Sequence, residues 1–229
     1  MIVSETSVNR HRVMVMDPPV LKQATPVLVG LHGLGTNADD FIDLARMLGL
    51  DECRIILPDA PLHLPGYPPG AYAWYNFETH DRDGIEKSRD HLFKVFDRFT
   101  DDPNVRRLDG KPKETSPLIV FGFSQGGVMA MESGLNYSGK IVAVVSMSGY
   151  MPDPSKTLAS PKLSKDTPIL VIHGAYDDVV PVQGSREAVK EMEKAGYKPE
   201  LREFDYGHQV SEESLETVSF FIRKALKSS

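Results

Sequence analysis

The sequence predicts an α/β protein with a doubly wound, mostly parallel sheet. Apolar stretches of strand length recur along the chain, and most are followed by a turn rich in Gly or Pro and then by an amphipathic stretch. The apolar stretches are short, nearly continuous and rich in Val, Ile and Leu, which is typical of strands covered by helices on both faces. The 229 residues, 41% of them hydrophobic, favour one domain over residues 1–229 rather than two ordinary ones.

The elements follow in the order that this fold class requires. A first, antiparallel edge strand is expected at Val8–Met16. The strands expected after it are Pro26–Leu31, Arg54–Leu57, Leu118–Phe123, Ile141–Met147, Ile169–Ile172 and about Glu200–Asp205. Helices are expected at Ala38–Leu48, Gly84–Phe99, Gln125–Leu135, Gly184–Ala195 and about Glu212–Leu226. Ligands of such sheets bind outside the carboxyl ends of the strands, so functional side chains are expected there.

Two connections are longer than a simple link between elements. Pro58–Asn76 is rich in Pro, Gly and aromatic residues, and Ser148–Thr167 is rich in Pro, Ser and Lys. Long ordered loops are often functional, so both are candidates for part of a site. The polar and charged stretch Thr100–Ser116 is interpreted as a solvated surface connection.

Composition excludes several classes of function. The net charge of −6 disfavours nucleic acid and anionic membrane surfaces as partners. No apolar run approaches the length of a membrane span, and the first residues lack a signal-peptide pattern, so we expect a cytoplasmic chain without stable membrane insertion. A single cysteine allows no intrachain disulfide. The histidines show no metal-ligand spacing, so neither metal nor cofactor is expected, and a homodimer is left open.

A nucleophile motif lies between the strand at Leu118–Phe123 and the following helix. Gly122-Phe123-Ser124-Gln125-Gly126 matches G-x-S-x-G, a pattern that is weak alone but specific between a strand and a helix. The sharp turn exposes the serine Oγ, and the glycines allow the strand and the helix to approach closely. Ser124 is therefore the candidate nucleophile, although a Gly-rich turn that only packs helix on strand would give the same letters.

A serine hydroxyl needs a base to accept its proton, and hydrolases with this motif place an acid and then a histidine downstream. Asp177 and Asp178 follow the strand at Ile169–Ile172, and either could be the acid. His208 follows the last strand, which makes it the candidate base. The remaining histidines lack this position, although His63 and His80 flank the Pro-rich loop. By position, the oxyanion donors are the backbone N–H groups of Leu34, in the loop after the strand at Pro26–Leu31, and Gln125.

With these motifs in order, the chain resembles the phospholipase/carboxylesterase family of α/β hydrolases, which includes acyl-protein thioesterases and small carboxylesterases. The resemblance extends from about Val27 to His208. Its motifs are Leu31-His32-Gly33-Leu34-Gly35, Pro58-Asp59-Ala60-Pro61, Trp74-Tyr75, Gly122-Phe123-Ser124-Gln125-Gly126-Gly127, Ser148-Gly149-Tyr150-Met151-Pro152, His173-Gly174 with Asp177 and Val179-Val180-Pro181, and Gly207-His208.

The resemblance implies the α/β-hydrolase fold and a serine hydrolase that cleaves small carboxylic esters or thioesters through an acyl-enzyme. It implies Asp177 as the acid, and it places the oxyanion donors on Leu34 and Gln125. Caps in this fold commonly follow the strand that ends here near Met147, and the connection to Ile169 is too short for a multi-helix cap, so no large cap domain is expected. Expected substrate-binding side chains are Leu62, Tyr67, Tyr72, Trp74 and Tyr150.

Two other classes of function stay open from the sequence. The same fold also carries peptidases and acyltransferases, and fold alone does not separate them from esterases. A non-catalytic hydrolase-like binding module is the third hypothesis, although such modules typically lose a triad residue and all three positions are filled here. Covalent labelling of Ser124 by a fluorophosphonate would distinguish an enzyme from a binding module.

Overall fold

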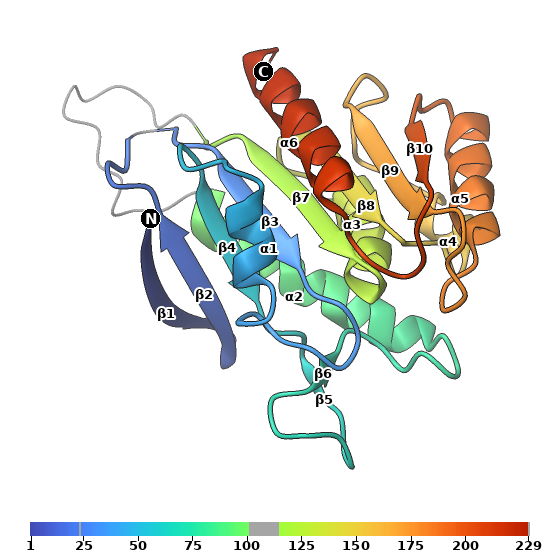
Figure 1. Ribbon diagram of the computed structural model, residues 1–229, viewed down its shortest axis with the longest axis horizontal. Helices are drawn as coiled ribbons and strands as arrows, with labels where there is room; N and C mark the ends of the chain where they lie inside the picture. The colour runs from blue at the N-terminus through green and yellow to red at the C-terminus, as the bar shows by residue number, and fades with distance from the viewer. Residues whose placement is uncertain (23, 101–114, 229) are drawn as a thin grey trace.

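The computed structural model describes residues 1–22, 24–100 and 115–228. Within these residues, the main sheet has eight strands in the order β1-β2-β4-β3-β7-β8-β9-β10 (Figure 1). Across the sheet, every pair of neighbouring strands from β4 through β3, β7, β8 and β9 to β10 is parallel. Strand β2 pairs antiparallel with both β1 and β4. Most of the predicted connection Thr100–Ser116 lies outside the described residues.

Apart from the first strand and the first helix, the bounds of the predicted elements agree closely with the sequence pattern. The strands are β1 (Ile2–Val8), β2 (His11–Asp17), β3 (Val27–Leu31), β4 (Arg54–Pro58), β5 (Leu62–His63), β6 (Tyr72–Ala73), β7 (Leu118–Phe123), β8 (Ile141–Met147), β9 (Ile169–Gly174) and β10 (Glu200–Phe204). The helices are α1 (Ile42–Met47), α2 (Arg82–Thr100), α3 (Gln125–Asn136), α4 (Pro154–Thr157), α5 (Val182–Lys194) and α6 (Glu212–Lys227).

Two apolar layers cover the sheet, one on each face. Helices α2, α3 and α5 pack on one face, and α1 and α6 pack on the other (Figure 1). Along β3, Val27 and Val29 belong to the first layer and Leu28 to the second. This alternation explains why the apolar stretches are continuous, since both faces of each central strand are buried. The predicted doubly wound sheet is confirmed.

The first strand was predicted wrongly. Val8–Met16 is not one strand, because a tight turn at Asn9 and Arg10 divides it into the hairpin β1–β2, and β1 rather than β2 lies at the edge. Both turn residues have positive φ, 49° and 70°, as the tight hairpin turn requires. Arg at the second position is unusual there, so the sequence lacked the usual Asn-Gly signal.

The long loops contain short elements but no large cap domain. Pro58–Asn76 forms the small hairpin β5–β6, which projects from the body of the molecule (Figure 1). Ser148–Thr167 contains only the short α4. Helix α1 is shorter than predicted because the Asn37 side chain accepts the N–H groups of Asp39 and Asp40 and forms a turn in place of the first helical residues. Among the described helices, none combines the length and apolarity that crossing a bilayer would require.

Candidate active site

Ser124 lies on a strained turn between β7 and α3. Its backbone has φ 56° and ψ −121°, a combination that costs energy for a residue with a Cβ and is held by the surrounding structure. A Cβ on Gly122 would overlap the carbonyl of Gly126, and a Cβ on Gly126 would overlap the carbonyl of Leu31. Only glycine therefore fits at either position, which is the physical reason for the G-x-S-x-G spacing.

The structure brings Ser124, His208 and Asp177 together from the ends of three parallel strands. The His208 Nε2 lies 3.0 Å from the Ser124 Oγ, and the His208 Nδ1 lies 2.7 Å from the Asp177 Oδ2. An ionised carboxylate only accepts, so Nδ1 carries the ring proton and Nε2 is free to accept the proton of the serine hydroxyl. Asp178, the alternative acid, is exposed, whereas Asp177 is buried.

Asp177 is held as an anion by several donors. Burial raises its pKa, but the hydrogen bond from His208 and those from the N–H groups of Val180 and Val179 outweigh burial and leave the pKa below its ordinary value. His173 Nε2 also lies 3.3 Å from the Asp177 Oδ2. His173 is fully buried, and its Nε2 is 2.7 Å from the carbonyl of Val180, so it supports the loop that carries the acid.

Backbone donors lie next to the serine. Gln125 is the first residue of α3, so its N–H has no partner within the helix and is directed toward the end where Ser124 lies. In the described part of the chain, the N–H of Leu34 makes no backbone hydrogen bond. Leu34, Gln125 and Ser124 all line one cavity. This placement fits an oxyanion hole.

Buried polar side chains hold the loop of Leu34 in place, a role that the sequence did not reveal. His32 Nδ1 donates to the carbonyl of Gly33, and its Nε2 accepts the N–H of Ala60. Burial lowers the pKa of His32, in agreement with a neutral ring in this arrangement. Asp59, from the Pro-Asp-Ala-Pro motif, accepts the N–H of Ala38. His32 and Asp59 therefore position the loop, and neither side chain is among the residues that line the cavity.

Trp74 is a correction to the predicted substrate-binding set. Its side chain is fully buried, with Nε1 donating to the carbonyl of His32 at 2.9 Å and its backbone N–H donating to the Gln125 Oε1 at 2.7 Å. An indole enclosed in this way does not reach a ligand. Through these two hydrogen bonds, Trp74 joins the Leu34 loop to the start of α3.

A cavity of about 640 Å³ opens beside Ser124. Its lining is mostly apolar, with polar groups among it: Leu34, Tyr75, Phe77, His80, Ser124, Gln125, Tyr150, Val179, Val180, Pro181, Gln183, Gly184 and Glu187. Of the predicted binding residues, Tyr150 lines this cavity, while Leu62, Tyr67 and Tyr72 lie in the β5–β6 segment outside the lining. A larger groove of about 840 Å³, between β10 and α6, includes none of Ser124, Asp177 and His208.

Comparisons with known proteins show the family to which the chain belongs. The family model for phospholipases and carboxylesterases matches residues 15–226. An acyl-protein thioesterase 1 from Gibberella zeae is 25% identical over 91% of this chain and 94% of its own length. A probable carboxylesterase from Oryza sativa subsp. japonica is 28% identical over 87% of this chain and 77% of its own. The crystal structure of esterase PE8 superposes with a TM-score of 0.77 at 26% identity, covering 98% of this chain and 100% of that one. The chain belongs to the phospholipase/carboxylesterase family of α/β hydrolases and is an enzyme that hydrolyses ester or thioester bonds.

Proposed function

We propose that the chain cleaves small carboxylic esters or thioesters through a Ser124–His208–Asp177 triad and an acyl-enzyme intermediate. The observation that carries the proposal is the continuous series of hydrogen bonds from the Ser124 Oγ through His208 to Asp177, with Ser124 in the lining of a cavity. A serine on a strained turn, a correctly oriented histidine and a buried anion are the groups that acyl transfer requires.

The proposed reaction has two halves. In the first, the Ser124 Oγ attacks the carbonyl carbon while the His208 Nε2 takes the hydroxyl proton, and this proton then passes to the departing alcohol or thiol. In the second, water attacks the acyl-enzyme, His208 takes a proton from the water, and Ser124 regains a proton as the acid leaves. Asp177 stabilises the positive ring of His208 in both halves. The N–H groups of Leu34 and Gln125 would stabilise the oxyanion, each by about 3–4 kcal/mol.

The names of the relatives favour esters and thioesters over the alternative substrates. One is an acyl-protein thioesterase and another is a probable carboxylesterase, so ester and thioester substrates come before peptides and acyl acceptors. A hydrolase-like binding module is disfavoured because Ser124, His208 and Asp177 are all present and are hydrogen-bonded to one another.

A fluorophosphonate probe and a p-nitrophenyl butyrate assay test the proposal. We expect the wild-type protein to gain one phosphonyl group by intact mass and to hydrolyse the ester, and Ser124→Ala to lose both properties, with kcat down by several orders of magnitude. Ser219→Ala is a matched control, because that hydroxyl lies on α6 and donates to the carbonyl of Leu48. Labelling or near-normal hydrolysis in Ser124→Ala would overturn the assignment of the nucleophile.

A further inference from the structure

Three polar side chains in the cavity beside Ser124 take no part in the proposed reaction. The Tyr75 Oη lies 3.1 Å from the Tyr150 Oη, which in turn lies 2.9 Å from the His80 Nε2. Tyr75 and His80 lie in the connection between β6 and α2, and Tyr150 lies in the connection after β8, so two connections meet here. All three side chains line the cavity. An otherwise mostly apolar pocket therefore has one polar wall, which we name the Tyr75–Tyr150–His80 wall.

The protons of this wall leave hydrogen-bonding capacity for a ligand. Burial raises the pKa of Tyr75 and of Tyr150, so both phenols keep their protons at neutral pH. If the His80 Nε2 accepts, both phenol protons are used within the wall and the phenol oxygens retain free acceptor positions. If the His80 Nε2 donates, one phenol proton remains free. A hydroxyl group both donates and accepts, so it suits the wall in either state.

Charge in the cavity argues against an anionic ligand group. Glu187 is a carboxylate of the lining, and no Lys or Arg is among the described residues that line the cavity. A carboxylate on the substrate would share the cavity with the carboxylate of Glu187, and the described lining supplies no fixed cation to compensate the two charges. A neutral hydroxyl has no such penalty and hydrogen-bonds to phenols and imidazoles.

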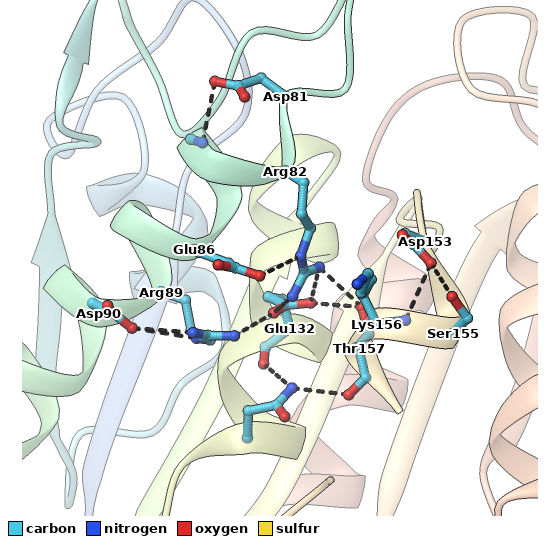
Figure 2. A network of polar contacts seen from close by, with 12 residues as sticks. Asp81, Arg82, Glu86, Arg89, Asp90, Glu132, Asp153, Ser155, Lys156 and Thr157 are labelled. Carbon is cyan, nitrogen blue, oxygen red and sulfur yellow. Dashed lines mark hydrogen bonds and ion pairs between the residues drawn. The ribbon is translucent and has the colours of Figure 1, made fainter. Parts of the chain in front are cut away.

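The segments that carry His80 and Tyr150 are joined by an ion-pair cluster around the buried Glu132, and Figure 2 shows this cluster. Glu132 on α3 is 3% exposed and accepts from Arg82 at 2.7 Å and 3.1 Å and from Thr157 at 2.6 Å. Arg82 is two residues after His80, and Thr157 ends the short helix that follows Tyr150. The loops that carry His80 and Tyr150 are thus tied to the same carboxylate.

The backbone of His80 adds a second sign of a fixed position. Its φ is 47°, an uncommon conformation for a residue with a side chain, which persists only where the surroundings enforce it. Asp81 accepts the N–H of Gly84 and so fixes the first turn of α2 directly after His80. Because the wall is ordered before a ligand arrives, little conformational entropy is lost when a ligand binds.

We propose that the Tyr75–Tyr150–His80 wall is a specificity site for a hydroxyl group on the part of the substrate held in the cavity. The inference rests on the proposed ester and thioester hydrolysis and adds a substrate class to it, namely hydroxylated esters or thioesters. The hydroxyl belongs either to the acyl chain or to the leaving alcohol, and the two sources are separated by the choice of substrates.

The test compares kcat/KM for propyl hexanoate with propyl 3-hydroxyhexanoate, propyl 6-hydroxyhexanoate and 3-hydroxypropyl hexanoate, measured by pH-stat. For wild type we expect at least one hydroxylated ester to exceed propyl hexanoate by about tenfold, the effect of one well-formed hydrogen bond. Tyr150→Phe should bring this ratio to about one, and the ratio compares two esters within the same variant, so a general change in activity cancels. His80 is exposed, so His80→Ala should leave the core folded. This variant should also lower the ratio toward one.

Tyr197→Phe is the matched control, because its hydroxyl donates to the carbonyl of Leu163 outside the cavity. The ratio should be the same in this variant as in wild type. Equal rates for all four esters in wild type, or a preference that survives Tyr150→Phe, would overturn the specificity site. Ester hydrolysis that still depends on Ser124 would in that case leave the proposed function standing, whereas hydrolysis independent of Ser124 would remove the proposed mechanism and not the hydroxyl preference.

Discussion

Two buried carboxylates lie near opposite ends of α3, and they are compensated in different ways. Asp177, near the first turn, is contacted by His208 and His173 and by the N–H groups of Val179 and Val180. Glu132, in the later part of the helix, is contacted by Arg82, Arg89 and Thr157 (Figure 2). Imidazole gains and loses a proton near neutral pH, whereas a guanidinium keeps its charge.

The difference separates a reactive cluster from a structural one. Among the described residues, no Lys or Arg pairs with Asp177, so its negative charge is available to stabilise a proton that arrives on His208. The charge of Glu132 is compensated in every state, so this cluster only joins α2 and α4 to α3. A burial fraction alone would not distinguish the two acids, since they are 7% and 3% exposed. The identity of their partners does.

Replacing Asp177 should give the largest change in activity. Asp177→Asn is expected to lower kcat by about 10⁴, because the amide no longer holds the His208 tautomer or stabilises the charged ring. The melting temperature should change little, since an amide oxygen still accepts a backbone N–H. Ester hydrolysis and thermal unfolding are the two measurements. Asp178→Asn is the control at the exposed neighbour and should stay within about twofold of wild type. The reverse ranking would show that the acid is Asp178.

Acid should affect activity and stability through different histidines. Activity should fall in acid, because His208 must be neutral to act as a base. Stability should fall through His91, which is 6% exposed and has no hydrogen-bond partner for either ring nitrogen in the described part of the chain. Burial, with smaller contributions from His11 and Lys94, lowers the pKa of His91 to about 4.

The loss of stability in acid follows from the uptake of a proton by His91 on unfolding. In the unfolded chain a histidine binds a proton below roughly pH 6.5, while the folded protein keeps His91 neutral to about pH 4. Its contribution is therefore fully present above pH 6.5 and declines toward pH 4, by up to about 3 kcal/mol. We expect His91→Leu to flatten the free energy of unfolding between these pH values in urea titrations. The pH profile of kcat/KM should stay unchanged, and a shifted profile would contradict the separation of the two effects.

Replacing Glu132 should affect the fold more than the chemistry. Glu132→Gln is expected to lower the free energy of unfolding by about 2 kcal/mol, less than a fully buried pair would lose because Arg82 and Arg89 are 22% and 20% exposed. Activity on a simple ester should stay within about threefold. Glu86→Gln removes the more exposed partner of the same arginine and should cost less than about 0.5 kcal/mol. A loss of activity like that of Asp177→Asn would break the distinction between the two clusters.

The sequence predicted the elements whose information is local. The strands and the nucleophile turn depend on residues next to one another, such as the glycines that flank Ser124. The candidate base followed from the order of elements along the chain, since His208 comes directly after the last strand. The first strand failed for an equally local reason, because Asn9 and Arg10 form a hairpin turn without the glycine that usually marks it.

The shape of the pocket was decided by the tertiary structure alone. Trp74 and Gln125 are 51 positions apart, and Tyr75 and Tyr150 are 75 apart, yet both pairs are hydrogen-bonded. A loop has no repeating period to indicate where its side chains point, so the same aromatic-rich stretch predicted a contact for buried Trp74 and missed neighbouring Tyr75. By itself the sequence determined the sheet, the nucleophile turn and the order of the candidate triad, because backbone periodicity and strand ends set them. Which loop side chains line the cavity depended on contacts between distant segments, and these form only when the chain is folded.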